Sequence, residues 1–142
     1  MGKMRVKQAE AERTEEKRPF LLKRIKKKVP EGRIYIQSTF NNTIITLTDK
    51  KGDVVFWSSA GRCGFKGTKK GTPYAASVVA NTVVEAAKMV GLRKVSLFVK
   101  GVGQGRDQAL RTLVAGGFEV EEIKDITPIP HGGPRPKKPR RV

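Results

Sequence analysis

The chain has 142 residues, with 30 lysines and arginines against 13 aspartates and glutamates, and its formal net charge is +17. Its single cysteine, Cys63, excludes an internal disulfide and a multi-cysteine zinc site, and its single histidine, His131, leaves a histidine-based triad or metal cluster without support. No apolar run approaches the roughly 20 residues that span a bilayer, so we expect a soluble intracellular protein without a cofactor or bound metal.

The excess positive charge is concentrated at the two ends of the chain. Residues 1–30 carry eleven basic and four acidic side chains, and residues 131–142 carry five basic and no acidic ones. Basic arms on a compact core bind polyanions, because each neutralised phosphate releases condensed counterions. The charge balance therefore indicates a nucleic-acid-binding protein. We predict a charged N-terminal extension over 1–30, largely disordered without RNA, a compact domain over 31–127, and a proline-rich basic tail over 128–142.

The elements begin with a short charged helix, expected over 9–18, and three strands follow. RIYIQST (33–39) alternates apolar and polar residues, and NTIITLTD (42–49) is rich in β-branched residues. Phe40-Asn41-Asn42 between them predicts a turn, because asparagine tolerates positive φ. A loop at 49–53 leads to VVFWSS (54–59), which completes an antiparallel meander.

The second half of the domain alternates helices and strands. Thr72-Pro73 predicts a helix start, with Thr72 as the N-cap, and Gly91 predicts its end after Val90. Its apolar residues cover more than one face, so we expect it to pack on the sheet and to be covered on another side. A strand at 94–99, a helix at 105–115 and a strand at 119–126 complete an α/β fold. The expected architecture is a mixed five-stranded sheet (β-β-β-α-β-α-β) packed with two helices, its last two strands parallel to a neighbour.

The first candidate binding segment is the loop AGRCGFKGTKKG (60–71). It has four glycines, which let the backbone approach another backbone closely, and the aromatic Phe65, a candidate for stacking on a base. The alternative is a flexible exposed loop that Phe65 anchors to the core. The basic residues that would meet phosphates are Arg62, Lys66, Lys69 and Lys70.

The second candidate is the glycine-rich turn KGVGQGRDQALR (100–111), between a strand and a helix. Amides at a helix start attract anions, and Arg106 lies in the first helical turn, close to such an anion. Arg111 is expected to face solvent or a partner. The glycine spacing matches neither the dinucleotide fingerprint nor a P-loop. The alternative is a tight turn with nothing bound.

The third candidate is the tail TPIPHGGPRPKKPRRV (127–142). Its prolines favour an extended backbone from which basic side chains project, and His131 is interpreted as a stacking or hydrogen-bonding residue. A further basic run precedes Pro30. Either basic segment is alternatively a solvated charge run. The tail candidates besides His131 are Arg135, Lys137, Lys138, Arg140 and Arg141, and those of the run are Lys26, Lys27 and Lys28.

Four segments, in this order, resemble the bacterial and organellar form of the small-subunit ribosomal protein S-eleven family. They are VPEGRIYIQSTFNNTIITLTD (29–49), SSAGRCGFKGTKKGTPYAA (58–76), VKGVGQGRDQALR (99–111) and DITPIPHGGPRP (125–136). The resemblance runs from about Lys26 to Val142. Family members usually carry proline where Val102 stands, so this turn is expected to be less rigid. They also usually carry Asn-Gly where this chain has Gly132-Gly133.

The resemblance implies a structural, non-enzymatic protein on the platform of the small ribosomal subunit. It implies binding to small-subunit ribosomal RNA, a place beside the messenger exit path and the Shine–Dalgarno cleft, and neighbours of the S-seven, S-eighteen and S-twenty-one types. We expect a bacterial cytoplasmic ribosome, with an organellar one as the other possibility, and no homo-oligomer. Carried onto this sequence, it adds Asn41, Asn42, Gly103 and Gly105 to the RNA-facing candidates.

Two other classes of function fit the sequence less well. A metal-dependent nuclease on this strand and helix order needs clustered carboxylates for two divalent ions, whereas Asp107 and Asp125 stand apart in the sequence. A DNA-compacting protein shares the charge, but the helix at 72–90 carries only Lys88 as a basic residue and is not suited to the major groove.

Overall fold

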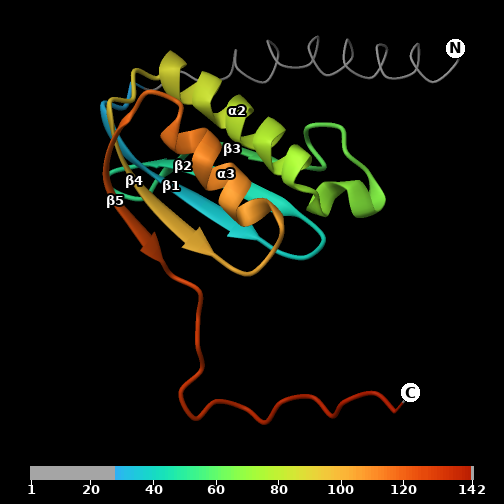
Figure 1. The fold of residues 1–142 in the computed structure, drawn as a ribbon. Coiled ribbons are helices and arrows are strands. Elements are labelled where there is room, and N and C mark those ends of the chain that lie inside the picture. The colour runs from blue at the N-terminus through green and yellow to red at the C-terminus, as the bar shows by residue number, and fades with distance from the viewer. Residues whose placement is uncertain (1–27, 142) are drawn as a thin grey trace, which may run out of the picture.

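The computed structural model describes residues 28–141, which form one five-stranded sheet with two helices and an extended tail (Figure 1). The sheet order is β3-β2-β1-β4-β5, with β1–β2 and β2–β3 antiparallel and β1–β4 and β4–β5 parallel. This confirms the predicted mixed α/β fold. The elements are β1 (Glu31–Ser38), β2 (Thr43–Asp49), β3 (Val54–Ser59), the short 3-10 helix η1 (Gly67–Gly71), α2 (Pro73–Met89), β4 (Lys94–Lys100), α3 (Gly105–Val114) and β5 (Glu119–Asp125).

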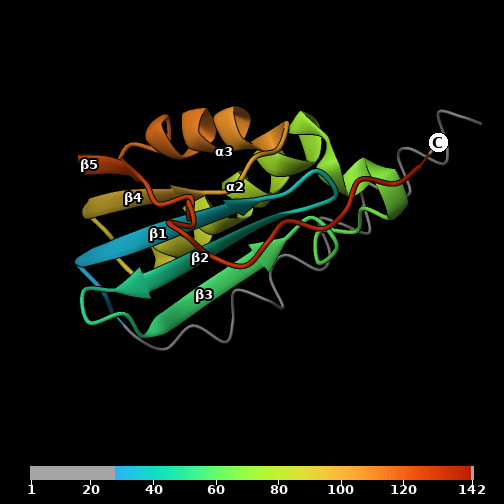
Figure 2. The same cartoon turned by 90° about the horizontal axis from the view of Figure 1, so that it is seen from below.

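Both helices cover the same face of the sheet (Figures 1 and 2). The strands alternate accordingly, because successive side chains of a strand point to opposite faces. The covered face of the three central strands contributes fully buried side chains, among them Ile34, Ile45 and Leu97. On the opposite face, Tyr35 and Phe98 are half-buried and their rings stack at 5.0 Å between centroids.

Helix α2 has the caps that the sequence predicts. The Thr72 hydroxyl accepts a hydrogen bond from the Ala75 amide at 3.3 Å, Pro73 occupies the first turn, and the chain leaves the helix through Gly91 at φ +75°. The helix packs against β2 and β3 and also against α3. Its two covered sides explain why its apolar residues, which include Val79 and Val83, extend beyond one face.

One stretch contains an element that the sequence does not predict. The loop 60–71 contains the 3-10 helix η1, which the sequence did not predict because a five-residue segment bounded by glycines has no measurable period. Residues 128–141 contain no helix or strand, and their side chains are exposed. The helix expected over 9–18, and most of the N-terminal extension, lie outside the described residues.

Candidate nucleic-acid interface

Three candidate segments meet at one end of the sheet. These are the turn 39–42 between β1 and β2, the strand–helix turn 101–105, and the end of the loop 60–71. Close packing holds them together: a Cβ on Gly71 would collide with the Phe40 carbonyl, and a Cβ on Gly103 would collide with the Thr39 carbonyl. Gly71 and Gly103 therefore allow the turn 39–42 to approach the backbone of the two loops closely. Contact between RNA and Gly103 or the buried Gly105 stays a prediction.

The turn 39–42 is closed by its own polar groups. The Thr39 amide donates to the Asn42 carbonyl at 2.9 Å, and the Asn42 amide donates to the Thr39 hydroxyl at 3.1 Å. The Asn42 side-chain oxygen accepts a hydrogen bond from the Thr43 amide at 2.9 Å, so this oxygen stabilises the turn. Asn41 is exposed, and Phe40 beside it is 77% exposed. Sequence reasoning missed Phe40 as a stacking candidate, although an aromatic residue in an otherwise polar turn is a usable signal.

The loop 60–71 separates anchoring residues from free cations. Phe65 packs on the core and meets Tyr74 edge to face at 5.8 Å, as the alternative interpretation of the loop held, and base stacking by Phe65 stays a prediction. The half-buried Arg62 guanidinium lies 4.5 Å from the centroid of the Trp57 ring and donates to the Trp57 carbonyl at 2.9 Å. The Arg62 guanidinium therefore already has partners within the protein.

The lysines of the same loop remain available. Lys66 and Lys69 are exposed, and Lys70 is half-buried. Within residues 28–141, no carboxylate forms an ion pair with any of the three. Helix η1 places Lys69 and Lys70 in its last turn, and the Thr72 hydroxyl donates to the Lys69 carbonyl at 2.7 Å, which fixes the backbone there. This loop can offer phosphates several cations from an ordered backbone.

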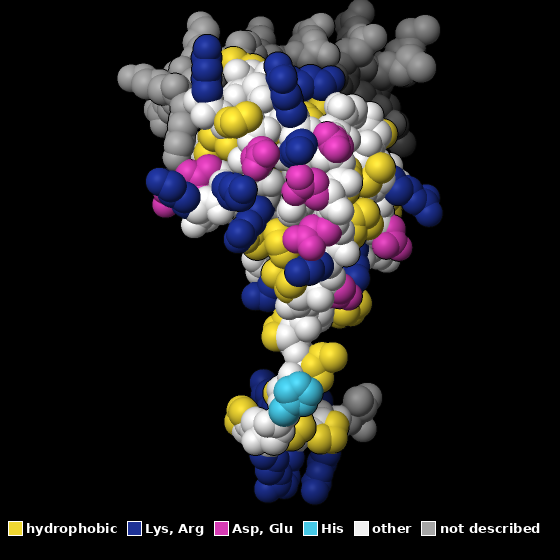
Figure 3. All heavy atoms as spheres, turned by 90° about the vertical axis from the view of Figure 1, so that its left-hand side faces the viewer, with side chains coloured by type: hydrophobic (Ala, Val, Ile, Leu, Met, Phe, Trp, Pro, Cys, Tyr) yellow, Lys and Arg dark blue, Asp and Glu magenta, His cyan; other side chains and the backbone are white. Residues whose placement is uncertain are grey.

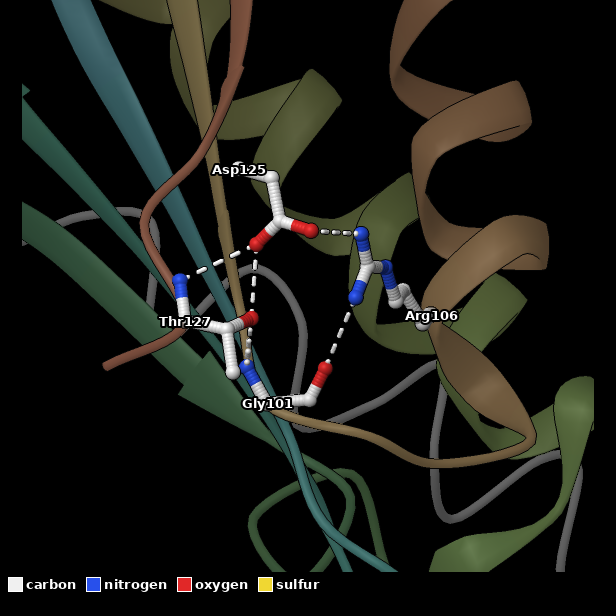
Figure 4. Close-up of polar contacts among 4 residues, drawn as sticks. All are labelled: Gly101, Arg106, Asp125 and Thr127. Carbon is white, nitrogen blue, oxygen red and sulfur yellow. Dashed lines mark hydrogen bonds and ion pairs between the residues drawn. The ribbon is translucent and has the colours of Figure 1, made fainter. Parts of the chain in front are cut away.

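Arg106 is held by groups of the protein (Figure 4). Its Nη2 donates to Asp125 Oδ2 at 2.6 Å, and its Nη1 donates to the Gly101 carbonyl at 3.0 Å. Hydrogen bonds from the Thr127 hydroxyl and amide, and from Arg106, hold the pKa of Asp125 well below its usual range. The carboxylate therefore stays ionised far into the acid range. The sequence analysis placed Arg106 beside a bound anion without foreseeing that Asp125 would pair with it. Phosphate binding by Arg106 stays a prediction.

The other candidates lie apart from this end. Lys28 precedes β1 and is therefore at the opposite end of the sheet from the turn 39–42. Arg111 is in the last turn of α3 and, with Lys88, lines a hollow of about 550 Å³ between the two helices. Lys26 and Lys27 lie outside the described residues. The structure therefore does not bring the whole predicted set together.

The tail leaves the domain at the interface end, because β5 is parallel to β4. It runs below the domain toward the side on which the loop 60–71 lies (Figures 1 and 2). Figure 3 shows acidic and basic side chains interspersed over the β5 side of the domain, whereas the tail below it displays a basic cluster and the histidine. The exposed residues of this tail cluster are His131, Arg135, Lys137, Lys138, Arg140 and Arg141.

Within residues 28–141, no three side chains of the His, Cys, Asp or Glu type gather where they could hold a metal ion. None of the helices in this range has the length and apolar character needed to cross a membrane.

Comparison with known proteins adds an independent line of evidence. A family model described as Ribosomal protein S11 matches residues 32–141. The chain is also similar to the small ribosomal subunit protein uS11 of Desulfotalea psychrophila (strain LSv54 / DSM 12343), with 55% identity over 123 residues that cover 84% of this chain and 95% of the relative. The family match spans the turn 39–42, the loop 60–71, the turn 101–105 and the tail.

Proposed function

The chain belongs to the ribosomal protein S11 family, whose members are structural rather than enzymatic, and we propose that it binds small-subunit ribosomal RNA as a constituent of that subunit. The observation that carries the proposal is the pairing state of the cations at one end of the sheet. Lys66 and Lys69 stand exposed without a carboxylate partner in residues 28–141. The Thr72 hydroxyl holds the Lys69 carbonyl, and Gly71 packs against the Phe40 carbonyl at the end of the loop. Unpaired cations on an ordered surface suit a rigid phosphate backbone.

The binding mode is neutralisation of phosphates by the loop and tail, together with recognition of RNA shape. Phosphate contacts position a protein on a nucleic acid, and structured RNA is recognised mostly by shape. Phe40 and Asn41 at the tip of the turn 39–42 are exposed and suit an unstacked base. Such a protein supports the folding and assembly of the RNA that it clamps.

The finer assignment follows from family membership. We propose that the chain sits on the platform of the small subunit, near the messenger exit path and the Shine–Dalgarno cleft. Its neighbours there are proteins of the S-seven, S-eighteen and S-twenty-one types, and its ribosome is a bacterial cytoplasmic one. The similarity to the uS11 protein supports this assignment.

The test compares two double variants, each of which replaces two lysines at one end of the sheet with glutamate. Lys69→Glu with Lys70→Glu is expected to weaken binding to small-subunit RNA by at least tenfold. It should also lower the salt slope by roughly 0.7–0.9 for each phosphate that the variant no longer neutralises. The matched control is Lys50→Glu with Lys51→Glu, which changes the charge equally in the loop 49–53 at the opposite end.

The readout is a gel shift or filter-binding titration over a range of salt, with circular dichroism to verify the fold. We expect the control pair to change affinity by no more than a few fold. Equally weakened binding by both pairs would mean that net charge, rather than this interface, determines binding. A preference for duplex DNA over the RNA would favour the DNA-compacting alternative.

A further inference from the structure

Four residues form a clip at the root of the tail: Gly101, Arg106, Asp125 and Thr127 (Figure 4). Asp125 Oδ1 accepts from the Thr127 hydroxyl at 2.6 Å and from the Thr127 amide at 3.0 Å. The Thr127 hydroxyl oxygen accepts from the Gly101 amide at 3.1 Å. With the two bonds from Arg106, each member of the clip contacts at least two others.

The clip ties three elements together at one point. Gly101 follows the end of β4, Arg106 lies in the first turn of α3, and Asp125 ends β5. The Ile126 amide extends the pairing with a bond to the Val99 carbonyl at 2.8 Å. Beyond Thr127, every residue from 128 to 141 is exposed and outside regular structure. The clip is therefore the last fixed point of the backbone before the basic tail.

The charges of the clip are not those of a phosphate site. The Arg106 side chain is only 29% exposed and already bonds two acceptors, whereas Asp125 is 52% exposed. Asp125 thus brings a negative charge to the end of the sheet where the lysines of the loop 60–71 lie. By Coulomb's law alone, that charge repels RNA and its removal would strengthen binding. Its bonds to Thr127 and Arg106 give it a structural use instead.

We propose that the clip is a positioning device for the tail: it fixes the direction in which the basic residues 135–141 leave the domain, and Arg106 acts through Asp125 and not as a phosphate ligand. The proposal rests on the proposed function, because it concerns how the tail is presented to RNA. A tail whose root is fixed loses less conformational freedom on binding than one that swings about β5.

The discriminating variants are Asp125→Ala and Thr127→Val. Thr127→Val leaves the net charge unchanged and removes the hydroxyl that both Gly101 and Asp125 bond. Both variants are expected to weaken RNA binding by roughly fivefold, the factor that corresponds to leaving about one backbone residue unfixed before binding. Thr112→Val is the matched control, since its hydroxyl bonds only within α3, to the Gln108 carbonyl.

The same substitutions are then made in a full-length tail-neutral variant, with Arg135, Lys137, Lys138, Arg140 and Arg141 changed to Gln. There Thr127→Val should have no effect, and Asp125→Ala should leave affinity unchanged or slightly higher. Amide hydrogen exchange gives an independent readout: it should accelerate at Gly101 in Thr127→Val and at Thr127 in Asp125→Ala, because each variant removes the acceptor of that amide. It also verifies that the rest of the domain is intact.

Three results would overturn the proposal: tighter binding by Asp125→Ala with the tail intact, an equal weakening in the tail-neutral background, or unchanged affinity in Thr127→Val despite faster exchange at Gly101. If Lys69→Glu with Lys70→Glu weakens binding while the clip variants do not, the clip proposal alone fails. If the unmodified protein does not bind the RNA, the proposed function fails first.

Discussion

The two ends of the sheet both carry lysine-containing loops, and the loops differ in what their charges and backbones contact. In the loop 49–53, Asp49 Oδ1 accepts from three backbone amides at 2.9 Å each, and Lys50 forms a 3.4 Å ion pair with Glu31. In the loop 60–71, Gly71 at the end of the loop packs closely against the Phe40 carbonyl, and no carboxylate of residues 28–141 pairs with its lysines. The loops therefore differ in that Lys50 of the loop 49–53 pairs with a carboxylate, whereas none of the lysines in the loop 60–71 pairs with a carboxylate of residues 28–141.

The largest expected effect comes from the tail, which leaves the domain at the same end of the sheet as the loop 60–71. Replacing its five cations with glutamine in the full-length protein should lower the log–log salt slope of RNA binding by roughly 0.7–0.9 for each phosphate that the tail neutralises. Titration at four or more salt concentrations measures the slope. An unchanged slope would show that the tail is merely solvated and would restrict the interface to the domain.

A smaller effect is expected from the glycine packing that fixes the loop. Gly71→Ala forces a side chain against the Phe40 carbonyl and should lower the free energy of unfolding by about 1–3 kcal/mol. Gly61→Ala in the same loop has no atom closer than 3.8 Å and should change it by no more than about 0.5 kcal/mol. Denaturant titration compares the two. Equal stabilities would show that the contact between loop and turn is not tight.

The smallest expected effect concerns single exposed apolar residues at the two ends. Phe40→Ala should weaken RNA binding by about fivefold if its ring stacks on a base, at the low end of the range for base–aromatic stacking. Val54→Ala, in a side chain 60% exposed at the opposite end of the sheet, should leave binding unchanged. The same filter-binding assay measures both. Equal affinities for Phe40→Ala and the unmodified protein would show that the Phe40 ring does not stack on an RNA base.

The regular elements could be predicted from the sequence because each has a local signal. Alternation marks the central strands, Thr72-Pro73 and Gly91 bound α2, and the covered sides of α2 follow from its wide apolar surface. The lysines of the loop 60–71 were likewise chosen from the composition of that short segment alone. These features depend on neighbours in sequence, and the structure confirms the elements.

The features that the sequence did not disclose depend on residues distant along the chain. Arg106 and Asp125 are 19 positions apart and meet because β5 lies beside β4, a pairing whose register no local pattern fixes. The resemblance made Gly103 an RNA-facing candidate, and in the structure a Cβ on Gly103 would also meet the Ser38 hydroxyl at the end of β1 and the Thr39 carbonyl. A glycine is needed both where a ligand approaches the backbone closely and where another segment of the same chain does. The sequence alone does not distinguish the two cases.

In the proposed binding mode, one end of the sheet and the tail contact the ribosomal RNA together. Ultraviolet crosslinking of sucrose-gradient fractions, followed by mapping of the attached peptides, locates these contacts. We expect co-sedimentation with small subunits at about one copy each, with crosslinks in the turn 39–42, the loop 60–71 and the tail. Crosslinks concentrated in the loop 49–53, or a protein that stays in the soluble fractions or travels with DNA, would contradict this binding mode.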